Sequence, residues 1–255
     1  MAIYFLRRLT GRKRSVEANE HLGLTLAFVA GATNAGGFLA VRQYTSHMSG
    51  IIAAMSDDLA LGNVSLALAG LGAVLSFLAG AACSAILINW ARRKRLHSEY
   101  ASSLLLEAFL LLCFGLLGAN LSLHMGLFIP VTVMLLCFIM GLQNAIITKI
   151  SKAEIRTTHV TGLVTDIGIE LGKLFYWNME RERPSKPMVL ANRKRLKLLL
   201  LLLSMFFVGG VAGGMSFKHI GFMSTVPLAF LLLILAAVPI LDDVFMRLHR
   251  IRKRA

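Results

Sequence analysis

Cysteine and the signatures of soluble enzymes are scarce in this chain. The three cysteines, Cys83, Cys113 and Cys137, all fall within long apolar segments, and none has metal-ligand spacing. We interpret them as small apolar core residues and not as a disulfide set. The sequence has no glycine-rich nucleotide loop and no HExxH or GxSxG motif. We therefore expect no cofactor, no metal and no enzyme, although polar residues within a membrane could still perform catalysis.

Acidic residues are also few. The chain has 13 Asp and Glu against 27 Lys and Arg, which gives a formal net charge of +14. The basic residues gather in four clusters, each beside an apolar segment: Arg7–Arg14, Arg92–Arg95, Arg181–Lys197 and Arg247–Arg254. This is the pattern of the positive-inside rule, so we expect membrane lipids and not nucleic acid as partners.

Apolar residues dominate the rest, at 56% of the chain with a mean hydropathy of +0.71. Six segments are long enough to cross a bilayer, which takes about 20 residues. They lie near 22–41, 65–90, 101–120, 125–148, 196–216 and 222–246. With every basic cluster in the cytoplasm, both termini are cytoplasmic and only Arg42 and Lys218 lie outside. No cleavable signal peptide is expected. The sequence thus predicts an all-α polytopic membrane protein.

The basic and polar stretches set the expected boundaries. Residues 1–20 and 248–255 form basic cytoplasmic tails around a single membrane domain at 21–247. Within it, one repeat covers about 22–120 and another about 125–247, with a charged cytoplasmic loop at 178–195.

The repeat is visible as matched polar motifs. Gly31, Asn34 and Ala35 match Gly141, Asn144 and Ala145 at an offset of 110. After a two-residue insertion, Thr45, Ser46, His47, Ser49, Gly50, Asp58 and Leu59 match Thr157, Thr158, His159, Thr161, Gly162, Glu170 and Leu171. FLAG at Phe77–Gly80 is further matched to FVGG at Phe207–Gly210.

Two polar segments, 44–63 and 153–177, decide the topology. If both crossed the membrane, the repeats would be parallel and Arg92–Arg95 would lie outside, against the charge rule. If neither crosses, each repeat has three spans and the second copy is inverted. We favour this 3+3 inverted repeat: six transmembrane helices plus two short re-entrant or broken polar helices, which enter from opposite faces and meet near the midplane.

The histidine segments are candidate substrate sites. Ser or Thr at a helix start can cap free N–H groups, and a helix N-terminus favours anions. His47 and His159 add hydrogen-bond donors, and the glycines allow close approach. This predicts an anion or carboxylate pocket from His47, Ser49, Gly50, His159, Thr161 and Gly162. The alternative is that these residues only cap two short helices.

Three carboxylates are candidates for ion coupling. His159, Asp166 and Glu170 share one helical stripe, and Asp58 keeps the same spacing from His47. A carboxylate–His pair at membrane depth could relay protons or hold a cation. Alternatively, these groups are solvated or paired with Arg42, Arg156 or Lys173.

Asn34 and Asn144 sit inside their spans, and Gln143 adjoins the second. These amides can bind substrate or make interhelical hydrogen bonds. Small residues four apart, such as Gly209 and Gly213, favour close helix packing and could also join two protomers in a homodimer. Glu107 has no matched partner; it is either paired in the bundle or near the cytoplasmic end.

Three stretches, GLQNA, RTTHVTGLVTDIGIELGKL and SHMSG, resemble the YoaK-like family of uncharacterised bacterial inner-membrane proteins. The resemblance covers roughly residues 20–247 and implies six or seven spans, but no substrate, cofactor or catalytic residue. The family often has Asp where this chain has Asn34, and Asn where it has Ile51. If that Asp carries ion coupling, this member has lost it.

Three functions are consistent with these patterns. The leading hypothesis is a secondary transporter or channel-like permease for a small polar or anionic solute, with its site at the repeat interface. The alternative is a non-transporting membrane protein that binds lipid or a partner protein. An intramembrane lipid enzyme is a third, which the inverted arrangement does not favour.

Overall fold

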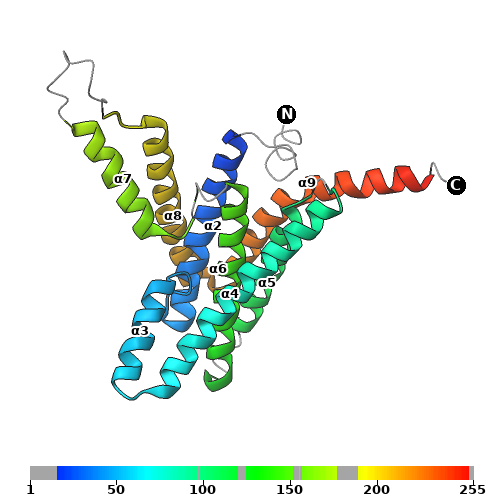
Figure 1. The fold of residues 1–255 in the computed structure, drawn as a ribbon. Helices are drawn as coiled ribbons and strands as arrows, with labels where there is room; N and C mark the ends of the chain where they lie inside the picture. Colours follow the sequence, from blue (N-terminus) through cyan, green and yellow to red (C-terminus); the bar gives the residue numbers. More distant parts are fainter. Residues whose placement is uncertain are drawn as a thin grey trace, which may run out of the picture.

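The described part of the chain is helical throughout. The computed structural model describes residues 16–96, 98–119, 125–151, 155, 157–176 and 189–252, and no strand occurs among them. The elements, drawn in Figure 1, are α2 (Val16–Val41), α3 (Met48–Ala60), α4 (Val64–Arg93), α5 (Ala101–Ala119), α6 (Met125–Ile150), α7 (Val160–Phe175), α8 (Arg193–Ile220), the 3-10 helix η1 (Gly221–Ser224) and α9 (Thr225–Arg252). Most of the N-terminal tail, residues 178–188 of the charged loop, Arg156 and residues 253–255 lie outside the described residues.

Long apolar helices coincide with the expected crossings. α2, α4, α5 and α6 contain the first four segments, and each is apolar enough to cross a membrane. The fifth candidate, Arg193–Ala237, has 45 residues and joins α8, η1 and the start of α9. At 1.5 Å per residue it would measure about 68 Å if straight, more than twice the roughly 30 Å of a hydrocarbon core. η1 interrupts it, with Gly221 at a φ of 68°.

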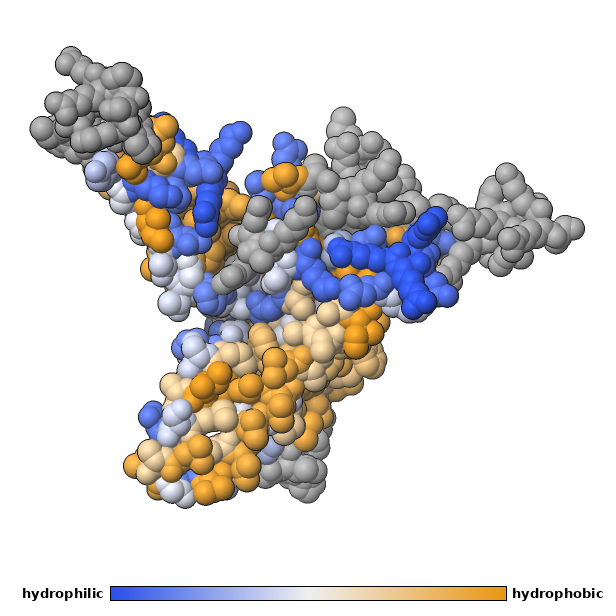
Figure 2. All heavy atoms as spheres, viewed as in Figure 1, coloured by the Kyte–Doolittle hydropathy of each residue, from blue (hydrophilic) through white to orange (hydrophobic). Residues whose placement is uncertain are grey.

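Large apolar side chains cover the outside of these helices, as a lipid environment requires. Leu66, Leu68, Leu75 and Leu78 of α4 are each more than half exposed. In Figure 2 apolar residues cover most of the lower half of the visible face, and hydrophilic residues gather toward the upper end. An outward leucine is unfavourable in water and favourable in lipid, so the chain has the surface of a multi-pass membrane protein.

Glycine allows two pairs of helices to pack backbone against backbone. In the pair α2 and α8, a Cβ on Gly31 would overlap the carbonyl oxygen of Phe206, and one on Gly209 would overlap that of Phe28. The contacts advance in step from Phe28 with Gly209 to Ala32 with Gly213, so α2 and α8 run parallel.

α4 and α6 pack in the same way. Gly80 lies against the carbonyl oxygen of Phe138, and Gly141 against that of Phe77. Lys149 Nζ donates to Asn89 Oδ1 at 2.9 Å further along, so this pair is also parallel. The glycine spacing therefore serves close packing, as expected.

The expected match of FLAG with FVGG is wrong by one residue. Gly80 contacts Phe138, and Gly209 contacts Phe28. Phe28 and Phe138 are themselves matched at the offset of 110, so Gly209 is the counterpart of Gly80. Phe206–Gly209, and not Phe207–Gly210, thus corresponds to Phe77–Gly80. A run of consecutive glycines, GG at 209–210, left the alignment ambiguous until the packing partners were known.

The remaining pairs run antiparallel. Between α2 and α6, Gln143 Nε2 donates to the Leu26 carbonyl at 3.2 Å and Asn19 Nδ2 to the Ile150 carbonyl at 3.5 Å. Between α5 and α9, Gly115 contacts Thr225, while Ser98 Oγ donates to Asp243 Oδ2 at 2.6 Å.

These pairings place the basic ends of the helices together. α4 and α5 are joined by a short turn in which Arg92 Nε bonds Glu99 Oε2 at 3.0 Å. The C-terminus of α4, with Arg92–Arg95, and the N-terminus of α8, with Arg193–Arg195, thus lie at one end of the bundle. We call it the basic end. Arg42 and Lys218, at the C-terminal ends of α2 and α8, belong to the opposite end.

Candidate functional site

The chain after α2 turns back along that helix before α3 begins. Arg42 adopts a φ of 56°, and Ser46 Oγ donates to Asn34 Oδ1 at 2.9 Å. Asn34 lies seven residues before Val41, the last residue of α2, or about 10 Å along the helix axis. The first turn of α3 therefore lies beside the inner part of α2 and not at its end.

α6 and α7 repeat this arrangement. Thr158 Oγ1 donates to Asn144 Oδ1 at 2.8 Å, and Asn144 Nδ2 donates to the Met140 carbonyl at 2.8 Å. Asn144 lies six residues before Ile150, so α7 also begins well inside the length of its neighbour. Each Asn, which the sequence left between two roles, fixes the start of a short helix; any contact of these amides with substrate stays a prediction.

The two histidines occupy the N-cap positions of α3 and α7, and both residues are exposed. Neither side chain makes a capping hydrogen bond with its helix. The expectation that Ser or Thr would cap these helices is therefore wrong, because the hydroxyls of Ser46 and Thr158 bond the asparagines. The N–H groups of both first turns therefore lack a side-chain cap from Ser or Thr.

Glycine at the third position of each helix is required by its histidine. A Cβ on Gly50 would collide with His47 Nδ1, and a Cβ on Gly162 would collide with His159 Nδ1. Each imidazole thus folds back over the first turn of its own helix. The predicted close approach is real, but its partner in the structure is the histidine ring. Ser49 and Thr161, beside these glycines, are exposed.

Two buried hydroxyls lie next to these turns; the sequence placed them only among the possible helix caps and not among the site residues. Thr45 and Thr157 are both 0% exposed, and the Oγ1 atom of each has no hydrogen-bond partner among the described residues. Gln143 Oε1 is likewise buried without a partner. An unsatisfied buried polar group costs about 1–3 kcal/mol. The occurrence of Thr at both matched positions was the signal that could have identified them.

Each histidine segment lies at its own asparagine. In the α2–α6 pair, Gln143 lies opposite Leu26 and Leu136 lies opposite Gly37. Asn34 of α2 is therefore level with a point on α6 that is five to nine residues from Asn144, or roughly 10 Å along the axis. α3 packs on α4 and α7 on α8, and in Figure 1 they extend toward opposite ends. The sequence predicts that the two segments meet at one point, whereas in the structure the two polar turns lie at different levels along the α2–α6 pair.

The carboxylates of α7 face α8. Asp166 Oδ2 accepts from Arg195 Nη2 at 3.0 Å, and Glu170 accepts from Lys173 Nζ at 2.8 Å and from the Asn192 backbone N–H at 2.7 Å. These hydrogen bonds, that from Lys173 first, lower the pKa of Glu170. The pairing with Lys173 was the structural alternative to ion coupling; ion coupling itself stays a prediction for Asp166 and Glu170.

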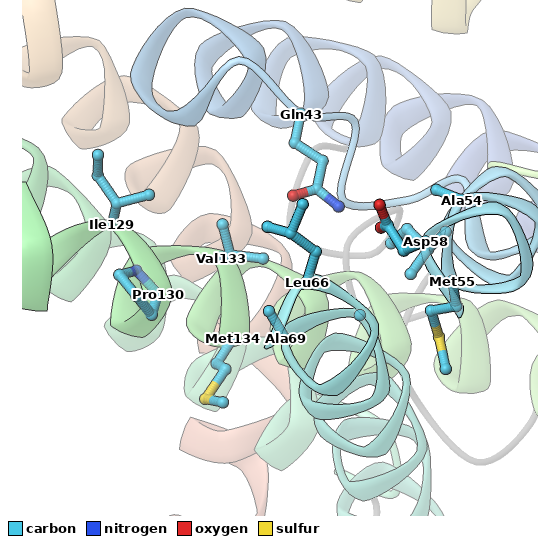
Figure 3. Close-up of a pocket in the computed structure, with 12 residues that line it drawn as sticks. Gln43, Ala54, Met55, Asp58, Leu66, Ala69, Ile129, Pro130, Val133 and Met134 are labelled. Carbon is cyan, nitrogen blue, oxygen red and sulfur yellow. The ribbon is translucent and has the colours of Figure 1, made fainter. Parts of the chain in front are cut away.

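Asp58, in contrast, lines a cavity of about 250 Å³ between α3, α4 and α6. In Figure 3 its carboxylate and the Gln43 amide supply the polar atoms beside mostly apolar walls. The other labelled residues there include Met55, Leu66 and Val133. No ion pair reaches Asp57 or Asp58 from the described part of the chain.

Family membership follows from the sequence over most of its length. Residues 22–238 match a family described as proteins of unknown function, DUF1275. The chain belongs to the DUF1275 family. The YoaK-like resemblance is consistent with this match. No curated protein and no solved structure matches the chain significantly. The function of this DUF1275 member must therefore be argued from its own geometry.

Proposed function

We propose that this DUF1275 protein is a secondary transporter or permease for a small polar or anionic solute. The observation that carries the proposal is the pair of equivalent polar turns: Ser46 on Asn34 before α3, and Thr158 on Asn144 before α7. Helices that begin inside the bundle leave backbone N–H groups at depth. In transporters such interrupted helices form the substrate site.

The proposed architecture is a 3+3 inverted repeat of six spans and two half-helices. It is supported by helix direction: α2, α5 and α8 run away from the basic end, while α4, α6 and α9 run toward it. Each helix of the first half thus opposes its counterpart, α2 against α6, α4 against α8 and α5 against α9. Counting α8 and α9 as separate crossings, divided at Gly221, gives the sixth span.

Polar chemistry at the two turns suits a small anion or zwitterion. The N-terminus of a helix carries about half a positive charge. His47 and His159 are exposed at these termini, and the hydroxyls of Ser49 and Thr161 lie one position beyond the first residue of each helix. Rocking of one half against the other would expose the site to each side in turn.

The basic end is proposed to face the cytoplasm of a bacterium, with both termini there. Single cysteines at the equivalent exposed positions test this, in a background without the three native cysteines. Ser49→Cys should react with an impermeant reagent from outside, and Thr161→Cys from the cytoplasmic face only. Labelling of both from one face would contradict the inverted arrangement.

Transport is tested by uptake into proteoliposomes from a panel of inorganic anions, carboxylates and amino acids. Wild type should accumulate at least one solute. Ser46→Ala and Thr158→Val should each reduce its uptake by tenfold or more. Ser56→Ala is the matched control, because Ser56 is exposed and bonds only its own helix at Ile52. A folded wild-type protein that transports nothing in the panel would contradict the proposal.

The second candidate is a non-transporting protein that binds lipid or a partner. The exposed apolar faces and the basic end favour it. It predicts that Ser46→Ala and Thr158→Val lower the thermal stability, and that no solute in the panel changes the thermal stability of the wild type. Protection of the wild type against heat by one solute, lost in both variants, favours transport.

A further inference from the structure

A single carboxylate is buried within the first half of α5 and has no partner among the described residues. Glu107 is 0% exposed, and neither Oε1 nor Oε2 has a hydrogen-bond partner among the described residues. It lies six residues from the start of α5, at Ala101, which is about 9 Å along the axis. The expectation from the sequence is that Glu107 is either paired in the bundle or near the cytoplasmic end. It is not paired among the described residues, and it lies in the half of α5 nearer the basic end, where it is fully buried.

Apolar residues face Glu107 across the helix pair. The contacts Gly115–Thr225 and Ser98–Asp243 set an antiparallel register in which Glu107 faces the stretch between Leu232 and Leu235 of α9. Both of these leucines are buried.

Charged groups on the packed elements are bonded elsewhere. α5 packs on α4, α6, α9 and η1. Three of their described charged side chains are bonded near helix ends: Arg92 to Glu99 and Tyr100, Lys149 to Asn89, and Asp243 to Ser98. Arg93 is exposed. The other described titratable groups are the thiols Cys83 and Cys137, and Cys113 on α5 itself. No cation among the described residues thus bonds a negative charge on Glu107.

The equivalent helix shows what the packing alone would accept. AFLLL follows Glu107 at residues 108–112, and the same AFLLL follows Leu228 at residues 229–233 of α9. Ala108 and Leu111 are buried, as are Ala229 and Leu232. Leu228 precedes this run in α9 and is buried, so the matched position there carries an apolar side chain.

An ionised carboxylate without partners is strongly disfavoured in such a site, so the side chain must hold a proton in this conformation. We infer that Glu107 is a proton-binding site that couples proton movement to the transport cycle. The proton resides on a carboxyl oxygen while α5 and α9 are packed as here. It passes to water when a rearrangement of the bundle hydrates the group, and returns from water on the other side. This inference rests on the proposed transport function.

Proton binding is tested without any solute. Infrared difference spectra of the reconstituted full-length protein, recorded across a pH titration, report the carbonyl stretch of a protonated carboxylic acid. Wild type should keep this band at neutral pH, and Glu107→Gln should lose it. Glu99→Gln is the matched control, since Glu99 is bound to Arg92 at the end of the same hairpin. A wild type without the band at neutral pH, or a band that survives in Glu107→Gln, overturns the inference.

Coupling is tested with the same uptake panel under an imposed pH gradient. Glu107→Gln should lose gradient-driven accumulation by tenfold or more but retain exchange of labelled for unlabelled solute. Glu107→Asp, which still titrates, should recover part of the accumulation. Unchanged accumulation in Glu107→Gln overturns coupling. If wild type transports nothing, the transport function and the coupling both fail, while the infrared band decides proton binding by itself.

Discussion

The two short helices begin alike and end differently. α3 and α7 both start at a histidine over a glycine, next to a hydroxyl bonded to asparagine. α3 then reaches α4 through residues 61–63, with Gly62 at a φ of 79° and an open cavity at Asp58. The end of α7 is held on α8 by Asp166 and Glu170. Under the proposed transport function, the shared start would serve one chemical task, and the different ends would make the two sides open differently.

The crossing glycines should show the largest effect and test whether the halves are equivalent. Gly31→Ala and Gly141→Ala each place a Cβ into a backbone carbonyl, which costs about 1–3 kcal/mol or more because backbone cannot step aside. Thermal unfolding should show a similar loss of stability for both variants.

Gly168→Ala is the control for these variants. Gly168 lies in α7, and a Cβ there would meet nothing within 4 Å. It should stabilise by up to about 1 kcal/mol, since Gly is a poor helix former. Equal destabilisation by all three substitutions would argue against backbone packing as the cause.

The histidine–glycine pairs come next. Gly50→Ala and Gly162→Ala should each displace an imidazole from the first turn and reduce uptake several-fold with little change in stability. Gly172→Ala, at another open position of α7, serves as the control. A loss confined to one half would show that the two turns do not share a task.

Acid should loosen the α7 end and leave the α3 end unchanged. Because the folded pKa of Glu170 lies below its usual value near 4.5, its contribution is present above that value and is lost as pH falls through the folded pKa. Amide hydrogen exchange in α7 should therefore quicken as the pH falls through the lowered pKa of Glu170, and Glu170→Gln should show the fast exchange already at neutral pH. Asp58→Asn is the matched variant in α3, where no change is expected.

The residue before each polar turn provides a further comparison of the two sides. Gln43 lines the cavity, while its counterpart Ile155 packs against Gly23 and Ile147. Gln43→Ile should raise stability by about 1 kcal/mol or less, since it adds apolar contact in the cavity. Ile155→Gln should destabilise by about 2 kcal/mol or more, because it buries an amide without a partner. Similar shifts from both substitutions would remove the difference between the two sides.

Much of the helix plan could be predicted, because long apolar runs and their basic flanks carry that information locally. All six segments fall in helices, and the two polar segments hold the short ones. The capping prediction failed because a Ser at a helix start can bond the preceding helix as readily as the N–H groups of its own helix. Ser46 does so at Asn34, twelve residues away, and no local pattern decides between these partners.

The sequence by itself determined the membrane character, the matched motifs and the family of this protein, since hydropathy and residue identity belong to the chain. Only the tertiary structure decided that α2 pairs with α8 and α4 with α6, that each histidine folds over its glycine, and that Glu107 has no partner among the described residues. These depend on groups brought together from distant positions. Packing and satisfaction of buried polar atoms, not local propensity, select among such partners.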